Sequence, residues 1–193
     1  MSCKDSSGKN VGSAKCGIYA FFDYDGEPIY VGQTYEGLSS RVGRHLTGQR
    51  SDAVAKHVLD PFEVCDVEVW PFWGLEKLPI EERKERLNAA EFTVFQLLIK
   101  KSYFGAILNE GNVVELPKVK LPESTRRRII PDDIYERRKH SDLRIARRAN
   151  TIANLAQVIS EREVNQGLRQ VLHTQAQRLE HLAKQRLDET NDE

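Results

Sequence analysis

Cysteine is scarce in this sequence, which contains only Cys3, Cys16 and Cys65. Their number is odd and no pair has C-x-x-C spacing, which excludes a disulfide framework and argues against a zinc finger. We therefore expect a protein of a reducing, cytoplasmic environment.

Long apolar runs are missing as well. No stretch approaches the roughly eighteen apolar residues of a membrane-spanning helix, so we expect no contact with a membrane. The first fifteen residues are polar, rich in Ser, Gly and Lys, and lack an apolar centre. This composition argues against a signal peptide and predicts a flexible N-terminal lead over residues 1–14.

Net charge is also absent, since 29 Lys and Arg residues balance 29 Asp and Glu residues. The total therefore gives no information about a polyanionic partner. The distribution is uneven, however. Basic residues gather in 41–57 and 118–150, whereas 59–91 is acidic.

The apolar and turn residues that are present predict a globular α/β domain of the α+β class. Short apolar runs flank Asp25-Gly26 and predict a β-hairpin over 16–32, and alternation over 62–70 predicts a third strand. Helical spacing predicts helices over 38–46 and from Pro79 to about Tyr103, with a shorter one over 52–58. We expect a short three-stranded antiparallel sheet flanked by helices, over residues 15–112.

The remainder of the chain predicts two further segments. Three prolines and the triplet Arg126-Arg127-Arg128 indicate a basic linker over 113–131 that is not packed. Residues 132–193 lack proline and repeat apolar residues at helical intervals, which predicts one long helix or a helical pair. The apolar seam of this helical C-terminal region would pack internally or pair two copies as a homodimer.

The predicted hairpin brings two phenols together. A two-residue turn at 25–26 pairs Tyr19 with Gly32 and Phe21 with Tyr30, so Tyr19 and Tyr30 become diagonal neighbours on one face. Gly17 and Gly32 leave space beside them. Paired tyrosines in a hairpin are more often packing residues than catalysts, so this feature alone does not identify a catalytic site.

Two helices add ionisable groups. Arg41 and His45 are four residues apart and share one helix surface, which by itself is an ordinary solvated face. Glu91 lies on the apolar stripe of the later helix, between Leu87 and Phe95. A buried carboxylate requires a partner such as a metal ion or a cation.

The order of these residues resembles the GIY-YIG nuclease family. Gly17-Ile18-Tyr19 and Tyr30-Val31-Gly32 resemble the two halves of its signature. The remaining elements follow in the family's order: Arg41 as the catalytic arginine, His45 as the histidine or tyrosine of some members, Glu91 as the metal-binding glutamate and Asn109 as the late asparagine. The resemblance covers residues 15–112.

This resemblance implies a phosphodiester hydrolase that uses Mg²⁺ or Mn²⁺ held by Glu91. Arg41 would contact the phosphoryl group, and Tyr19, Tyr30 or His45 would handle the proton of the attacking water. Arg44 is a rival for the arginine role, because Arg41 lies one residue further from Tyr30 than in many relatives. Gln33 stands where some members carry lysine.

The resemblance also gives the basic blocks an interpretation. Such clusters are usually solvated surface, but beside a nuclease domain they are candidates for contacts with phosphates. The partner would be DNA, with RNA as the alternative. The candidate residues are Arg50, Lys56, Arg126, Arg127, Arg128, Arg137 and Arg138, followed by Arg144, Arg147 and Arg148.

The main hypothesis is therefore a divalent-metal-dependent endonuclease acting on DNA. Two alternatives have other bases. A non-catalytic nucleic-acid-binding module on the same fold would explain the absent lysine at Gln33. A helical assembly or interaction protein would place the function in residues 132–193, with the first domain as a scaffold.

Overall fold

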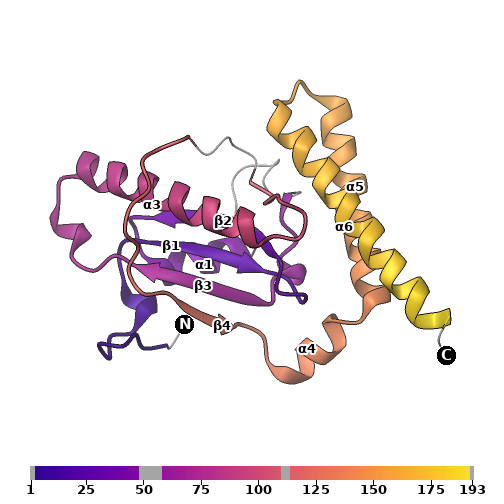
Figure 1. The fold of residues 1–193 in the computed structure, drawn as a ribbon, viewed down its shortest axis with the longest axis horizontal. Coiled ribbons are helices and arrows are strands. Elements are labelled where there is room, and N and C mark those ends of the chain that lie inside the picture. The colour runs from indigo at the N-terminus through magenta and orange to yellow at the C-terminus, as the bar shows by residue number, and fades with distance from the viewer. Residues whose placement is uncertain (1–2, 48–57, 110–113, 192–193) are drawn as a thin grey trace.

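The computed structural model describes residues 3–47, 58–109 and 114–191. Its centre is a four-stranded antiparallel sheet with the strand order β2-β1-β3-β4. The strands are β1 (Gly17–Phe22), β2 (Pro28–Thr34), β3 (Asp66–Pro71) and β4 (Thr125–Arg128). The expected α+β class is confirmed, with one strand more than the sequence predicted (Figure 1).

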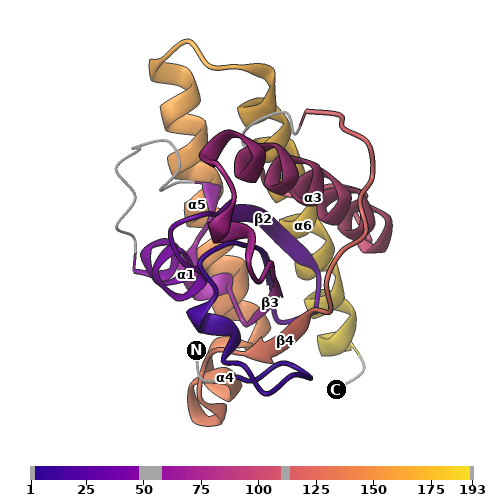
Figure 2. The same ribbon diagram turned by 90° about the vertical axis from the view of Figure 1, so that its left-hand side faces the viewer.

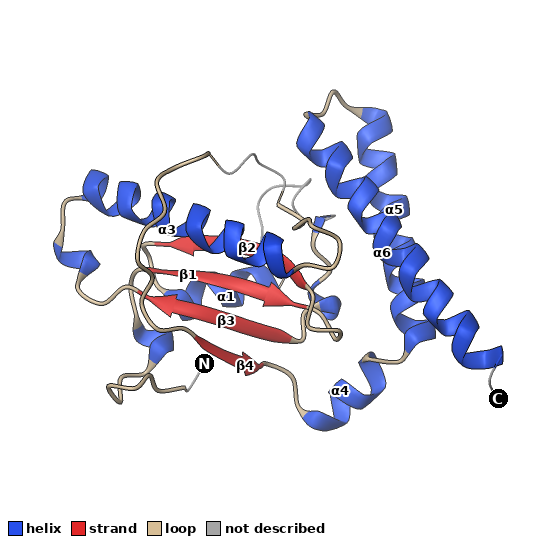
Figure 3. Ribbon diagram, in the orientation of Figure 1, coloured by secondary structure: helices blue, strands red, loops and turns tan. Residues whose placement is uncertain are grey.

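Two helices cover the two faces of this sheet. In Figure 3, α3 (Ile80–Lys101) lies in front of the strands and α1 (Leu38–Leu46) lies behind them. Figure 2 shows the same two helices on opposite sides of the sheet. Both agree closely with the predicted helices, whereas the helix expected over 52–58 lies almost entirely outside the described residues.

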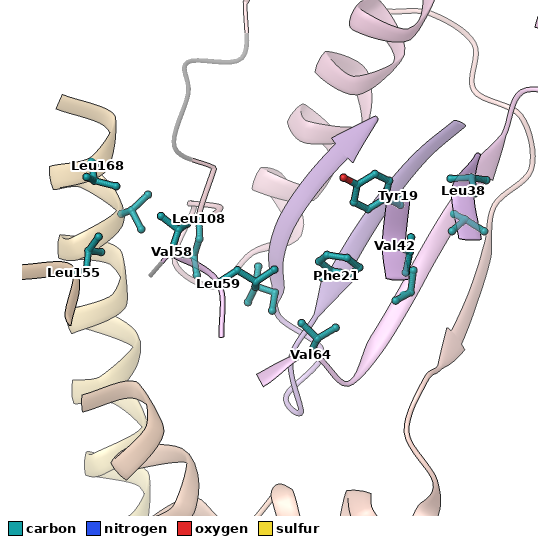
Figure 4. Packing of buried hydrophobic residues seen from close by; sticks show 14 of the residues in the cluster. Tyr19, Phe21, Leu38, Val42, Val58, Leu59, Val64, Leu108, Leu155 and Leu168 are labelled. Carbon is teal, nitrogen blue, oxygen red and sulfur yellow. The ribbon is translucent and has the colours of Figure 1, made fainter. Parts of the chain in front are cut away.

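The alternation of side chains along β1 divides the core into two layers. Tyr19 and Phe21 face α1 and pack with Leu38 and Val42, as Figure 4 shows. Ile18, Ala20 and Phe22 face α3 instead. Because successive residues of a strand point to opposite faces, one strand supplies both layers.

The hairpin has the predicted register over most of its length. Tyr19 pairs with Gly32 and Phe21 with Tyr30, but the register shifts beyond Phe21. The turn is longer than two residues, because Asp23 Oδ1 accepts hydrogen bonds from the backbone N–H groups of Asp25 and Glu27. Gly26 follows with φ 77°, a conformation that favours glycine.

The N-terminal segment is packed, contrary to the expectation of a flexible lead over 1–14. Val11 and Ala14 are buried in the α1-side core, and Val11 begins the short 3-10 helix η1 (Val11–Ser13). The Ala14 carbonyl accepts a hydrogen bond of 3.0 Å from Leu38 N. Trp73 Nε1 also donates to Asp5 Oδ2 at 2.8 Å, so apolar and polar contacts together hold this segment against the domain.

The predicted linker over 113–131 also contains packed structure. Residues 125–128 form the edge strand β4, where Arg126 Nε donates to Asp66 Oδ2 at 2.9 Å and its guanidinium lies 3.6 Å from the Phe22 ring centroid. Ser124 Oγ donates to Glu68 at 2.6 Å. Acidic residues of β3 thus hold a basic strand that has almost no apolar content.

The C-terminal region is helical, as predicted, and forms a pair after the short helix α4 (Asp132–Arg138). The pair consists of α5 (Ser141–Glu161) and α6 (Gln166–Asn191), which pack against each other beside the sheet (Figure 1). Leu155 and Leu168 join a cluster that includes Val58 and Leu108 of the first domain. Figure 4 shows these residues between the helices and the strands.

A buried ionic network fixes this helical pair to the hairpin turn. Its acids are Asp23, Asp25, Glu27 and Glu63, and its bases are Arg144, Arg147, Arg148 and Arg178. Arg148 bridges Asp23 at 2.8 Å and Glu63 at 3.3 Å, and all three side chains are buried. Burial lowers the pKa of Arg178 to about 10, although Asp23 and Glu27 oppose this shift.

The network contradicts one expectation from the sequence. Arg144 and Arg148 are buried and bound to carboxylates, so they are not available to phosphates. Arg147 is also paired, with Glu63 at 2.6 Å.

Within the described ranges, no helix combines the length and the apolar content that crossing a membrane requires.

Candidate active site

The two signature tyrosines meet on the α1 face of the sheet. Tyr19 on β1 is fully buried, whereas Tyr30 on β2 is half-buried, and their ring centroids are 6.2 Å apart. This separation agrees with the diagonal pairing expected from the hairpin register. The sheet therefore places one phenol inside the protein and the other at its boundary.

The two signature glycines make room for different neighbours. A Cβ atom on Gly32 would lie 2.5 Å from Tyr19 Cζ and 2.9 Å from Tyr30 Cε1. A Cβ atom on Gly17 would lie 2.8 Å from the Trp70 carbonyl oxygen. The Tyr19 ring thus occupies the volume that a side chain at position 32 would fill, so the glycine is a packing requirement for the phenol.

Helix α1 brings His45 to the tyrosines. His45 is buried, and its Nε2 shares a hydrogen bond of 2.8 Å with the Tyr19 hydroxyl. The imidazole centroid is 5.1 Å from that of Tyr30. Leu38 and Val42 anchor the inner face of the helix, which turns His45 towards the sheet.

Burial raises the pKa of Tyr19 well above its ordinary value, and the neighbouring Tyr30 raises it further. The nearby Arg41 guanidinium acts in the opposite direction but does not cancel these effects. Tyr19 is consequently a neutral phenol at physiological pH. A proton acceptor is available beside it in the imidazole ring of His45.

The two candidate arginines of α1 have different surroundings. Arg41 interacts electrostatically with Tyr19, Tyr30 and Glu91, and its buried Nε–H has no acceptor among the described residues. Burial disfavours its charge, but the interactions with Tyr19, Tyr30 and Glu36 together outweigh this effect and raise the pKa of Arg41. The Arg44 Nε–H is also buried without an acceptor among the described residues, but the Arg44 guanidinium forms a salt bridge of 2.8 Å with Glu36 on the surface.

Glu91 of α3 reaches the same group of side chains from the other side of β2. Burial raises the pKa of its carboxyl group to about 7, while the Gln33 hydrogen bond and the Arg41 charge oppose this shift. Gln33 Nε2 donates to Glu91 Oε2 at 3.0 Å and to Asn88 Oδ1 at 2.6 Å. The half-buried carboxylate therefore receives one neutral donor.

Asn109 has a structural role at the edge of the sheet. Its Oδ1 accepts from Val31 N at 3.1 Å, and its Nδ2 donates to Val31 O at 2.8 Å. The amide satisfies both backbone groups of Val31 on the open side of β2, as a neighbouring strand would. It thereby holds the strand that carries Tyr30 and Gly32.

Glu91 is the candidate metal ligand of this site. In the described ranges, no three side chains of His, Cys, Asp or Glu converge as a metal site would require. Glu91 nevertheless fits a hard divalent cation, because a cation would compensate its partly buried charge and water and phosphate oxygens can complete the coordination. Gln33 and Asn88 were not predicted to belong to this group. For Asn88 the sequence did contain a signal, because Asn88 lies three residues before Glu91 and therefore on the same surface of the helix.

The predicted nucleic-acid contacts divide into three groups. Arg126 and Arg128 form salt bridges with Asp66 and Asp132, and the Arg138 guanidinium lies 4.6 Å from the Phe62 ring centroid. Arg127 and Arg137 are exposed and have no salt bridge to any described residue. Arg50 and Lys56 lie outside the described residues.

These features define a small α+β domain with a phenol, an imidazole, a guanidinium and a carboxylate at one sheet edge. Residues 15–75 match the family model of the GIY-YIG catalytic domain. The match includes both tyrosines, Arg41 and His45 but ends before Glu91 and Asn109. The comparisons with curated proteins and with solved structures found no match.

Proposed function

We propose that the protein is a divalent-metal-dependent endonuclease that hydrolyses phosphodiester bonds in DNA. The observation that supports this most is the convergence of the Tyr19–His45 pair, Arg41 and Glu91 around β2, in a chain whose residues 15–75 match a GIY-YIG catalytic domain. Hydrolysis requires water activation, stabilisation of phosphoryl charge and assistance to the leaving oxygen. These side chains can contribute to each requirement.

The Tyr19–His45 pair and Tyr30 would manage the attacking water. A neutral phenol is a poor base, whereas imidazole accepts protons near neutral pH. Tyr19 would pass its proton to His45 Nε2 across the 2.8 Å hydrogen bond while taking one from the water. Tyr30, whose side chain reaches the boundary of the protein, would orient that water.

Arg41 and Glu91 would act on the phosphate. The Arg41 guanidinium interacts electrostatically with Tyr19, Tyr30 and Glu91, and from this position it would bind a phosphoryl oxygen. Glu91 would hold Mg²⁺ or Mn²⁺, which when bound stabilises charge on the phosphoryl and leaving oxygens. Arg127 and Arg137 are exposed, form no salt bridge with a described residue, and would contact phosphates further along the substrate.

The test is cleavage of plasmid DNA, single-stranded DNA and RNA in Mg²⁺ or Mn²⁺, followed by sequencing of the cut ends. We expect Glu91→Gln and Arg41→Ala to reduce cleavage at least about 100-fold, because each removes stabilisation of the transition state. Arg44→Ala is the matched control on the same helix and should retain activity within a few-fold. Cleavage by Glu91→Gln at the wild-type rate would refute the proposal, and DNA binding without cleavage in any divalent metal would favour the non-catalytic module.

A further inference from the structure

Gln33 connects the edge strand to the candidate metal ligand. It follows Gly32 on β2, and its side chain points to the α3 face because alternate residues of a strand face opposite sides. There its Nε2 atom donates both hydrogens, to Asn88 Oδ1 at 2.6 Å and to Glu91 Oε2 at 3.0 Å. The two acceptors are three residues apart and so lie on one surface of α3.

Two hydrogen bonds, to Asn88 and to Glu91, fix the position of the Gln33 amide. Asn88 fixes the amide plane, since both hydrogens on one nitrogen are directed by that plane. With the plane fixed, the second hydrogen locates Glu91 Oε2. No described residue donates a hydrogen bond to the other oxygen, Oε1.

The neutrality of this donor is important. A cationic side chain at position 33 would form an ion pair with Glu91 and compete with a divalent cation for its charge. An amide orients the carboxylate without neutralising it. The negative charge of Glu91 therefore remains available for a cation, while the carboxylate is prevented from rotating.

We propose that Gln33, anchored by Asn88, is a positioning residue that orients Glu91 for a divalent cation. This inference rests on the proposed function, in which Glu91 is the metal ligand. Partners of metal ligands commonly affect metal affinity by about 10–100-fold. The Gln33–Asn88 pair would act in the same way, without itself contacting the metal or the scissile phosphate.

The test is direct measurement of Mn²⁺ binding to the full chain without DNA, by electron paramagnetic resonance or calorimetry. We expect Gln33→Ala to weaken Mn²⁺ binding about 10-fold, and Asn88→Ala to weaken it by a smaller factor. In cleavage assays the half-saturating Mn²⁺ concentration should rise by the same factors, while kcat at saturating Mn²⁺ stays within a few-fold of the wild type. A structural role alone would not produce this split.

Gln96→Ala is the matched control, because it removes the same amide from α3 and Gln96 makes no hydrogen bond to a described residue. It should bind Mn²⁺ like the wild type. Thermal unfolding confirms that each variant is folded.

The inference is overturned if Gln33→Ala binds Mn²⁺ within twofold of the wild type, or if the wild type binds none. A wild-type protein that binds Mn²⁺ through Glu91 but cleaves no nucleic acid would overturn the proposed function alone.

Discussion

At the scale of single residues, the site depends on Gly32, which has no side chain to compete with the Tyr19 ring. Tyr19 and Gly32 face each other across β1 and β2, and the phenol occupies the space beside the glycine. The sequence predicted this pairing from the turn alone, because strand residues alternate and a hairpin fixes their partners. It did not predict that the phenol would be fully buried.

We expect Gly32→Ala to displace Tyr19, because the new methyl group would overlap its ring. The free energy of unfolding should fall by about 1–3 kcal/mol, and cleavage should fall with it. Gly43→Ala on α1 is the control, since nothing lies within 4 Å of its added Cβ atom. That variant should be neutral or slightly stabilised. Chemical denaturation measures both, and equal stability of the two variants would contradict this account of Gly32.

Glu91 gives a second prediction, which concerns pH. Its pKa is raised from 4.5 to about 7 in the folded protein, so the folded state binds the proton more tightly than the unfolded state. Stability contributed by the protonated carboxyl is complete below about pH 4.5 and is lost as the pH rises through 7. Glu91→Gln carries no such charge and should be more stable than the wild type at pH 8 by about 1–3 kcal/mol.

Denaturant unfolding at pH 4 and pH 8 checks this prediction in metal-free buffer. The two proteins should differ little at pH 4, where the wild-type carboxyl is protonated. If the difference were instead larger at pH 4 than at pH 8, the carboxylate would be stabilised by its surroundings and the assigned effect of burial would be wrong.

At the scale of elements, the arginines of α5 stabilise the fold. Arg148 bridges Asp23 of the hairpin turn and Glu63 of the 3-10 helix η2 (Pro61–Glu63). The helical spacing of α5 was readable from the sequence, but the acids that its arginines meet are 85 and 125 residues away. No local pattern carries that information, so these residues were predicted to contact phosphates.

We expect Arg148→Ala to destabilise the protein by about 3–5 kcal/mol, because it removes the closest countercharge of the buried Asp23 carboxylate, leaving Arg144 at 3.7 Å as its nearest ion-pair partner. Arg137→Ala on α4 is the matched control, since Arg137 is exposed and has no salt bridge to any described residue. Its free energy of unfolding should change by less than about 0.5 kcal/mol. Urea denaturation of both variants provides the comparison, and a stable Arg148→Ala protein would show that the network contributes little.

At the scale of the whole molecule, the helical pair is part of the same folded unit as the catalytic domain. Leu155 and Leu168 share a core cluster with Val58, Leu59 and Leu108. The sequence predicted an unpacked linker over 113–131 because of its three prolines, which do interrupt helices but do not prevent packing. Whether two copies associate through this region stays a prediction.

We expect a chain ending at Pro131 to be insoluble or unfolded. Removing α4, α5 and α6 would expose Val58, Leu59 and Leu108 to water and would leave Asp23 and Glu63 without their arginines. Soluble expression and circular dichroism test this outcome. A truncated protein that is soluble and unfolds cooperatively at the wild-type temperature would show that the catalytic domain folds independently.

The hairpin register and the helices that carry Arg41, His45 and Glu91 could be predicted from the sequence, because they depend on local periodicity and turn chemistry. Which charged residues pair inside the protein depends on the tertiary fold. Acids of the stretch 59–91 neutralise part of the basic stretch 118–150, through pairs such as Asp66–Arg126 and Glu63–Arg148. Such pairing depends on which distant segments the fold brings into contact, and the linear sequence does not contain those distances.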